Sequence, residues 1–368
     1  MKAKAAILQQ FNEPLVVEKI EIPPLSQGQM LVQVEAAGVC GSDVHMWRGK
    51  DPRTPLPMIL GHEGVGRVVD IKVEKRDIHD RPVDVGDLIL WERGVTCGIC
   101  YYCTVLHEPA LCPHRWVYGI SRSCEEPPYL NACYATHVIL DPHTAIIPLE
   151  NVKDPARYVA ASCSGATAAH SFALSPVQVG DTVVILGPGP LGAFCVALAR
   201  ADGAERVVII GGTKARLALC RNLGATHILN RHEGDPSERR EIIHDLTHGR
   251  GADLVVEASG SVAAAHEGLG LVRPGGALSL VGFGTPVGEM TLSPFEQVVR
   301  KNVRVQGVWV SDVRHTLRAV SLVRQREAAF AELVTHRFSL DEATTALEAV
   351  ARREAMKAVL IPDESQGV

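Results

Sequence analysis

The feature that most constrains the fold is a glycine-rich turn between an apolar run and a helical pattern. Gly187-Pro-Gly-Pro-Leu-Gly192 matches G-x-G-x-x-G and stands between the strand-like run Thr182–Leu186 and the helical pattern Leu191–Ala201. That context favours dinucleotide binding over an ordinary strand–helix turn, because glycines let a pyrophosphate approach the helix N-terminus. The residues expected to contact a dinucleotide here are Gly187, Gly189, Pro190, Leu191 and Gly192.

Strands and helices alternate regularly after this turn. The apolar patterns predict strands at Arg206–Ile210, Ala252–Glu257, Ala277–Val281 and Val303–Trp309, and helices at Lys214–Leu223, Glu238–Thr247 and Val262–Leu271. This βαβ rhythm is typical of an α/β fold with a doubly wound parallel sheet, the Rossmann arrangement. A helical stretch at Pro155–Phe172 is expected to lead into it.

The first 150 or so residues read differently, with period-two alternation at Met30–Ala36, Gly64–Ile71 and Gly86–Trp91. We expect a mostly antiparallel, partly barrel-like domain there. The tail, with a helix near Asp341–Ala351 and a strand at Ala358–Ile361, is expected to complete it. The predicted division is residues 1–155, 156–311 for the dinucleotide-binding domain, and 312–368 returning to the first domain.

The strand after the glycine turn ends without the acidic residue that commonly holds an NAD ribose. Gly211-Gly212-Thr213-Lys214 stands at that point, so nothing repels a 2′-phosphate. Gly211, Thr213, Lys214 or Arg216 could contact the cofactor, although a solvated helix face explains the two cations equally well. The cofactor is therefore NAD or NADP.

Four of the ten cysteines lie in one short segment, at Cys97, Cys100, Cys103 and Cys112. Such spacing is typical of a closed, tetrahedral structural zinc site. His107 and His114 are close enough in sequence to be rival ligands, but four cysteines suffice. Four further cysteines stand singly and are assigned no role, because a free cysteine is usually a small buried hydrophobe: Cys124, Cys133, Cys195 and Cys220.

Composition narrows the function classes. The 368 residues are 46% hydrophobic with a formal net charge of −5, which disfavours disorder and nucleic-acid binding. The long uncharged run Thr182–Ala199 contains Gly187-Pro-Gly-Pro, which would break a membrane helix. With no secretory pattern at its start, the chain is expected to be cytoplasmic and not membrane-bound.

Several motifs, in order, resemble one family. GVCGSDVHMWRG around Cys40, LGHEGVGRV around His62, CGICYYC and the glycine turn are similar to the zinc-dependent medium-chain alcohol dehydrogenases, notably a bacterial zinc-type subgroup. The resemblance extends from about Leu31 to Ile361. It implies a GroES-like catalytic domain, two zinc ions per chain, and NAD or NADP. One departure is that eight residues separate Cys103 from Cys112 where seven are usual, which predicts a bulged loop.

The resemblance also implies the roles of individual residues. Cys40, His62 and Cys163 would hold a catalytic zinc with an open fourth position, the arrangement known for alcohol dehydrogenases. Glu63 matches an adjacent acid that can move onto the metal. Asp43 would orient the zinc histidine. Ser42 and His45 match the hydroxyl and imidazole of the proton relay, and Thr167, in the Ser162–Thr167 segment, is expected to contact the cofactor.

The predicted function is hydride transfer between an alcohol–ketone pair and NAD(P). A secondary or cyclic alcohol is favoured over ethanol, because Trp47, Trp91, Trp116, Tyr118 and Trp309 could line a bulky pocket, although core or interface positions are the commoner use of such residues. The alternatives are a non-catalytic dinucleotide-binding zinc protein and a zinc-ribbon interaction module. Val303–Trp309 resembles the family's subunit-pairing strand, which implies a homodimer or homotetramer.

Overall fold

The computed structural model describes residues 1–362. The chain forms two compact units. The first contains Met1–Cys163, Ser311–Val323 and the chain from Leu333 onward; the second contains Ser164–Val310 and Arg324–Glu332. The first unit therefore joins the N-terminal segment with the described chain from residue 333 to 362. Within residues 1–362, none of the helices has the length and apolar character that crossing a bilayer requires.

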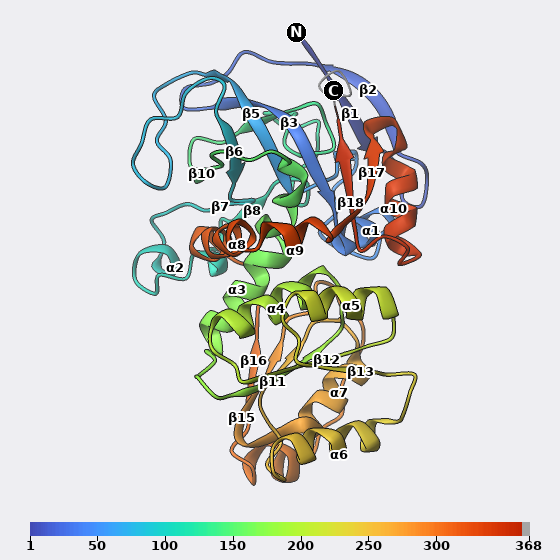
Figure 1. Cartoon of the computed structure of the whole chain (residues 1–368). Coiled ribbons are helices and arrows are strands. Elements are labelled where there is room, and N and C mark those ends of the chain that lie inside the picture. The colour runs from blue at the N-terminus through green and yellow to red at the C-terminus, as the bar shows by residue number, and fades with distance from the viewer. Residues whose placement is uncertain (363–368) are drawn as a thin grey trace. The chain divides into compact units, whose positions relative to one another are not determined.

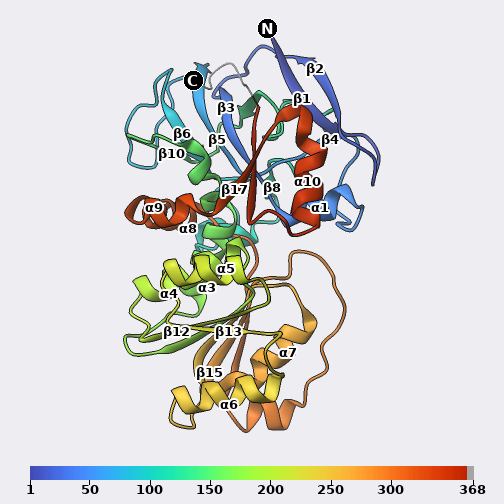
Figure 2. The ribbon, with the colours of Figure 1, turned by 45° about the vertical axis from the view of Figure 1, so that its right-hand side comes forward.

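The second unit is built on a six-stranded sheet whose paired strands all run parallel. Its strands are β11 (Thr182–Leu186), β12 (Arg206–Gly211), β13 (His227–Asn230), β14 (Ala252–Glu257), β15 (Val272–Leu280) and β16 (Arg304–Gly307). Its helices are α3 (Ser164–Leu174), α4 (Pro190–Ala201), α5 (Lys214–Asn222), α6 (Pro236–Leu246), α7 (Val262–Leu271) and α9 (Glu327–Ala331). Helices α4 and α5 cover one face of the sheet and α6 and α7 the other (Figures 1 and 2).

The strand order is β13-β12-β11-β14-β15-β16, which confirms the doubly wound Rossmann arrangement. The order reverses at β11, because β12 lies on one side of it and β14 on the other. At such a reversal the connections leave to opposite faces and open a crevice beyond the carboxyl ends of the strands. The glycine turn begins at Gly187, directly after β11, so it lies at this crevice.

The first unit is mostly β. Its main sheet has the path β10-β6-β5-β3-β18-β17, with β9 also paired to β3, and smaller sheets pair β2-β1-β4 and β7-β8. The strands are β1 (Lys2–Leu8), β2 (Val16–Glu21), β3 (Met30–Val39), β4 (Met58–Ile59), β5 (Gly64–Ile71), β6 (Leu88–Trp91), β7 (Gly94–Val95), β8 (Trp116–Val117), β9 (His137–Leu140), β10 (Ile146–Pro148), β17 (Val334–Ser339) and β18 (Lys357–Ile361). The pairing is antiparallel except between β17 and β18.

The C-terminal strand completes this sheet next to the segment that carries Cys40. Strand β18 pairs antiparallel with β3, with Ala358 opposite Val39, so the red strand lies beside the blue one in Figure 1. The helices here are α1 (Gly41–Trp47), α2 (Tyr101–Thr104), α10 (Ala343–Ala351) and α8 (Val313–Gln325), whose last two residues belong to the second unit. Helix α10 packs on α1, as Figure 2 shows.

The structure corrects some predicted element bounds. The predicted helix Pro155–Phe172 is broken into two 3-10 turns and α3, because Cys163 has φ −124° and ψ −81° and leaves the helical region. Helix α6 begins earlier than predicted, where Asp235 caps the backbone amide of Glu238. Strand β15 begins five residues before the predicted start at Ala277, through a register shift against β14.

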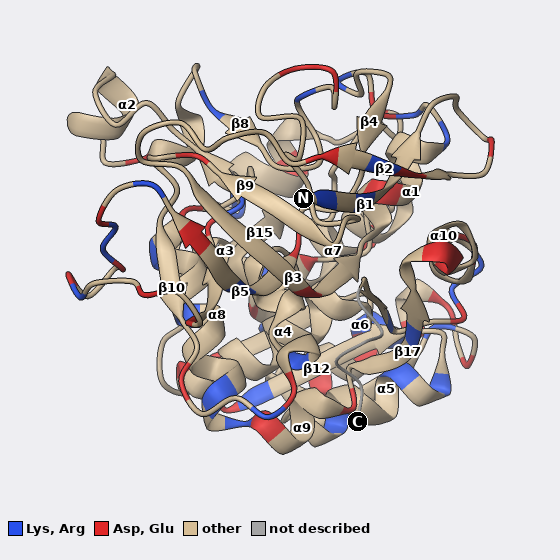
Figure 3. Cartoon of the chain, turned by 90° about the horizontal axis from the view of Figure 1, so that it is seen from above, with Lys and Arg blue, Asp and Glu red and all other residues tan. Residues whose placement is uncertain are grey.

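Acidic and basic side chains are interspersed over the described chain. Blue and red segments alternate along the ribbon in Figure 3, and many are paired as ions, such as Arg67 with Glu35 and Arg81 with Glu150.

Candidate metal centre

The four clustered cysteines come together at the tip of a loop. Strands β7 and β8 pair at its base, with Val95 opposite Trp116, and the four sulfur atoms lie within 4.8 Å of one another. Cys100 Sγ is 3.5 Å from Cys103 Sγ and 3.8 Å from Cys112 Sγ, while Cys112 Sγ is 3.5 Å from Cys97 Sγ. A tetrahedral zinc with Zn–S bonds of about 2.3 Å separates its sulfurs by about 3.8 Å. The cluster therefore fits a closed zinc site.

The long spacing before the last cysteine is absorbed within the loop. Between Cys103 and Cys112 the chain has His107 at a left-handed φ of +55° and a 3-10 turn at Pro109–Leu111. His107 and His114 are not part of the cluster, in which the four cysteines are the grouped ligands. Neither histidine is therefore needed as a ligand of this zinc site.

A second cluster gathers residues that are far apart in the sequence. Cys40, His62, Glu63 and Cys163 place one potential ligand atom each within 4.8 Å of the others. Cys40 lies between β3 and α1, His62 and Glu63 precede β5, and Cys163 directly follows a 3-10 turn. His62, Glu63 and Cys163 are buried. All four belong to the first unit.

Asp43 orients the histidine of this cluster. Its Oδ1 lies 3.2 Å from Nδ1 of His62, while its Oδ2 accepts hydrogen bonds from the Cys40 backbone amide at 2.8 Å and from the Tyr134 hydroxyl at 3.3 Å. Both ring nitrogens are buried and make no hydrogen bond in the described chain, and with Asp43 beside Nδ1 the position left for a further ligand is Nε2. A buried imidazole nitrogen without a partner is costly unless a ligand occupies it.

The two sulfurs of the cluster lie close enough together to change each other's pKa. Cys40 Sγ and Cys163 Sγ are 4.0 Å apart. Their hydrogen bond holds the pKa of Cys40 well below its usual value and, with burial, raises the pKa of Cys163 well above it. Burial opposes the charged form of His62, yet the negative charges of Asp43 and Cys40 raise the pKa of His62 to about 10. Two sulfurs and an imidazole nitrogen this close together are a donor set that fits zinc.

Glu63 forms an ion pair with Lys357, a residue that the sequence motifs did not identify. Lys357 Nζ, from β18, lies 2.5 Å from Glu63 Oε2, and both side chains are buried. A β-carbon on Gly38 would lie 2.2 Å from the same carboxylate oxygen, so only glycine leaves room for the pair. Lys357 gave no signal in the sequence, because a lone lysine before an apolar strand is ordinary. Each of these two charges can be buried only because the other one compensates it in an ion pair.

The predicted relay residues lie on one short helix. Ser42 and His45 are both on α1, spaced so that they share a face. Ser42 Oγ is 3.9 Å from Cys40 Sγ, which places the hydroxyl beside the cluster. His45 is half-buried in the last turn. Ser42 therefore lies beside the cluster, and His45 lies one turn further along the same helix.

The predicted cofactor residues lie together in the second unit. Gly187 donates its backbone amide to Ile210 O at 2.9 Å, which ties the turn to the end of β12. Gly189 precedes α4, with Pro190 in its first turn. A β-carbon on Gly192 would lie 1.9 Å from the Gly187 carbonyl oxygen, so this position must be glycine for the turn to close. Thr213 stands at the start of α5, and Thr167 lies on α3.

The aromatic residues divide between core and surface. Trp91 and Tyr118 are fully buried, and the Tyr118 hydroxyl is 2.6 Å from Thr144 Oγ1. These two are core residues, which was the commoner expectation. Trp47 donates Nε1–H to Glu13 O at 2.7 Å, Trp116 stacks under Arg122, and Trp309 is 46% exposed.

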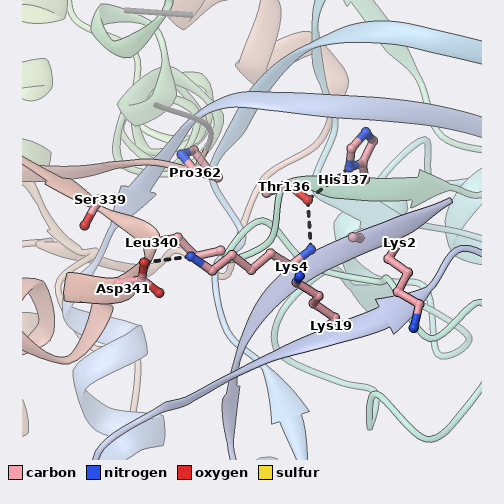
Figure 4. Close-up of a pocket in the computed structure, with 10 residues that line it drawn as sticks. Lys2, Lys4, Lys19, Thr136, His137, Ser339, Leu340, Asp341 and Pro362 are labelled. Atoms are coloured by element: carbon pink, nitrogen blue, oxygen red, sulfur yellow. Dashed lines mark hydrogen bonds and ion pairs between the residues drawn. The ribbon is translucent and has the colours of Figure 1, made fainter. Parts of the chain in front are cut away.

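A separate surface pocket on the first unit lacks comparable chemistry. Lys2, Lys4, Lys19 and His137 are among the residues lining it (Figure 4). Lys4 Nζ is paired with Asp341 at 2.6 Å, and the Lys4 backbone amide donates to Thr136 Oγ1. These are satisfied contacts at an exposed surface, so the clusters remain the chemical centre of the molecule.

Comparison with known proteins agrees with this geometry. Residues 26–151 match the family model "Alcohol dehydrogenase GroES-like domain", and residues 190–325 match "Zinc-binding dehydrogenase". The chain is 33% identical over 364 residues to 5-exo-hydroxycamphor dehydrogenase of Pseudomonas putida, covering 97% of this chain and 98% of that protein.

Solved structures agree as well. An alcohol dehydrogenase from Thermotoga maritima is 48% identical, with a TM-score of 0.96 over 99% of this chain and 100% of that one. A zinc-binding dehydrogenase from Sinorhizobium meliloti, solved with NADP, is 27% identical, with a TM-score of 0.84 over 98% of this chain and 100% of that one. Together with the two metal clusters and the glycine turn, these likenesses establish that the chain belongs to the zinc-dependent medium-chain alcohol dehydrogenases.

Proposed function

We propose that the protein interconverts a secondary or cyclic alcohol and its ketone, with zinc held by Cys40, His62 and Cys163. The observation that carries this proposal is the buried cluster in which these residues and Glu63 bring ligand atoms within 4.8 Å. Two thiolates and one neutral imidazole would leave one tetrahedral position for the substrate. The 33% identical relative, named for its action on hydroxycamphor, supports a cyclic substrate.

The residues around the cluster take distinct roles. Bound zinc would supply Lewis acidity that makes the alcohol hydroxyl easier to deprotonate. Ser42 accepts that proton, and His45 on the same helix passes it toward water, because a neutral imidazole has one nitrogen that accepts a proton and one that donates. Asp43 keeps His62 oriented through Nδ1. The ion pair with Lys357 holds the Glu63 carboxylate in place.

The second unit would bind the dinucleotide that accepts the hydride. Gly187, Gly189 and Gly192 would hold the pyrophosphate at the N-terminus of α4, with Pro190 and Leu191 forming the first turn. The rest of the dinucleotide would be contacted by Thr167, Gly211 and Thr213. The complete protein is expected to be cytoplasmic, with no nucleic-acid or membrane partner.

We infer that NADP binds more tightly than NAD. The side chains of Arg231 and His232 lie against Gly212: a β-carbon built there would be 2.7 Å from Arg231 Nε and 2.5 Å from His232 Nε2. Lys214 is exposed at the start of α5 nearby in sequence. Lys214 and Arg231 follow the carboxyl ends of β12 and β13, where a ribose 2′-phosphate is read in this fold, and Glu233, the acid that comes next, accepts a hydrogen bond from Asn230 Nδ2 at 2.7 Å.

A homo-oligomer is proposed from the free edge of the second sheet. Strand β16 ends the strand order, and its Val305 is 42% exposed. An open strand edge with an exposed apolar side chain favours pairing with a second copy. Light scattering should give the mass of a dimer or tetramer; a monomeric mass at micromolar concentration would refute this part.

The experiment for the activity is a panel of alcohols followed by nicotinamide absorbance. Cyclic and secondary alcohols should be oxidised with a higher kcat/KM than ethanol, and NADP should have the lower Kd. Arg231→Ala should weaken NADP binding about tenfold while barely changing NAD, a loss of about 1.4 kcal/mol. Arg221→Ala, an exposed arginine later on α5, is the matched control. Binding of neither cofactor would leave only a non-catalytic zinc protein.

A further inference from the structure

A second buried cation touches the proposed catalytic zinc site, and none of the motifs accounts for it. Arg93 is only 6% exposed, and its Nη1 lies 2.9 Å from Cys163 Sγ. Its Nη2 is 3.5 Å from Ser311 Oγ. Burying a guanidinium costs desolvation free energy. The contact between Arg93 and the sulfur of Cys163 must therefore offset that cost.

The backbone holds Arg93 at the base of the four-cysteine loop. Arg93 lies between β6 and β7, and its carbonyl accepts a hydrogen bond from the Tyr118 amide at 3.1 Å, directly beyond β8. The paired strands β7 and β8 connect this contact to the cysteine loop. Arg93 links the structural zinc loop to the second cluster.

The neighbouring residue is also immobilised. Glu92 Oε2 accepts from Thr316 Oγ1 of α8 at 2.6 Å, and its Oε1 accepts from the Gly94 amide at 3.2 Å. An arginine side chain is not deprotonated in proteins, so the Arg93 guanidinium is a cation. A permanent, planar donor thus points at the sulfur from a fixed segment.

Buried charges of both signs surround the cluster. Asp43 and Glu63 bring two negative charges, and Arg93 and Lys357 bring two positive ones, all four buried. A charged N–H donor on a thiolate draws electron density from the sulfur. Outer contacts of this kind tune how strongly a ligand donates to its metal.

We propose that Arg93 is a positioning residue that donates a hydrogen bond to Cys163 and limits the electron donation of that sulfur to the catalytic zinc. This rests on the proposed function, since it takes Cys163 as a zinc ligand. Its consequence is a more electron-poor metal, better able to acidify an alcohol. The residue acts through the ligand and needs no contact with substrate.

The test replaces zinc with cobalt and reads the sulfur-to-cobalt charge-transfer absorption. Arg93→Met keeps the length but removes the donor, so the band should move to longer wavelength, because the sulfur electrons become easier to remove. Arg93→Lys keeps the charge on a less directional donor and should give a smaller shift. Zinc transfer to a chelator should change in rate by about 10–100-fold in Arg93→Met, and kcat should fall on a similar scale.

The matched control is Arg239→Met. Arg239 is also 6% exposed, but it pairs with Glu267 in the second unit at 2.7 Å. That variant should lose stability with no change in the cobalt spectrum. An unshifted band in both Arg93 variants, with cobalt bound, would overturn the proposal. If Arg93→Met fails to fold, Arg93→Lys decides alone. A wild-type band that Cys40→Ala leaves unaltered would instead refute the zinc assignment itself.

Discussion

The two metal clusters of the first unit are built in opposite ways. The four-cysteine cluster lies on one loop, uses a single ligand type, and has three half-buried members, Cys97, Cys100 and Cys103. The second cluster draws on separated segments, mixes sulfur, nitrogen and oxygen, and is ringed by buried charges such as Asp43 and Lys357. A local, all-sulfur site suits cross-linking, whereas a mixed site with outer charges suits chemistry.

The largest expected effect separates the two clusters by activity. Cys40→Ala removes a ligand of the mixed cluster, so alcohol oxidation should fall by at least about a thousandfold, since several kcal/mol of charge stabilisation depend on the metal. The measurement is kcat/KM with the best alcohol of the panel. Cys133→Ala, a buried cysteine of the same unit outside both clusters, should keep activity near wild type. Comparable losses in both variants would mean that the mixed cluster is not the active site.

The buried ion pair should matter more than any surface pair. Lys357→Met leaves the Glu63 carboxylate buried without its cation, which should lower the free energy of unfolding by about 3–5 kcal/mol. Chemical denaturation measures it. Lys2→Met is the control, because Lys2 pairs with Glu21 at the exposed surface. Equal, small changes in the two variants would show that the Glu63–Lys357 pair does not form.

The four-cysteine cluster should affect stability more than chemistry. Cys100→Ser should lose the structural zinc and lower the stability by about 2–4 kcal/mol, the size expected for a cross-link over a short loop. Thermal unfolding is the measurement, with residual activity assayed at low temperature. If Arg93 transmits the state of this loop, kcat will fall slightly even where the protein stays folded. A variant with unchanged stability would argue against a structural role.

The sequence predicts sites built from one short segment better than sites assembled from separated segments. Cys97 to Cys112 are close in the chain, so spacing alone indicates their site. The glycine turn with its alternating strands likewise determines the Rossmann unit, because its signals are local. Cys40, His62 and Cys163 needed a family resemblance, since nothing in their spacing brings them together; β3, β5 and the broken segment before α3 do that.

The residues missed by sequence analysis share a physical reason. Arg93 and Lys357 are ordinary cations in sequence, and cations are mostly exposed. Only the sheet register, with β18 beside β3, places Lys357 against Glu63. Arg93 is positioned by the pairing of β7 and β8. The helix break at Cys163 was also unpredicted, because the surrounding alanines favour a continuous helix.

The smallest expected effect concerns a rejected ligand. His114 is exposed and lies outside the cysteine cluster, although it follows Cys112 closely in sequence. His114→Gln should retain the structural zinc and change the free energy of unfolding by less than about 0.5 kcal/mol. Zinc analysis after gel filtration checks this. Loss of zinc would move one ligand of the site from cysteine to histidine.

The most direct test of the account is the zinc content of the purified chain and of one variant for each cluster. Elemental analysis should find two zinc ions per wild-type chain, and one each in Cys40→Ala and Cys100→Ser. Activity should disappear only with the ion lost in Cys40→Ala. A single zinc in the wild type that Cys40→Ala leaves in place would contradict the account.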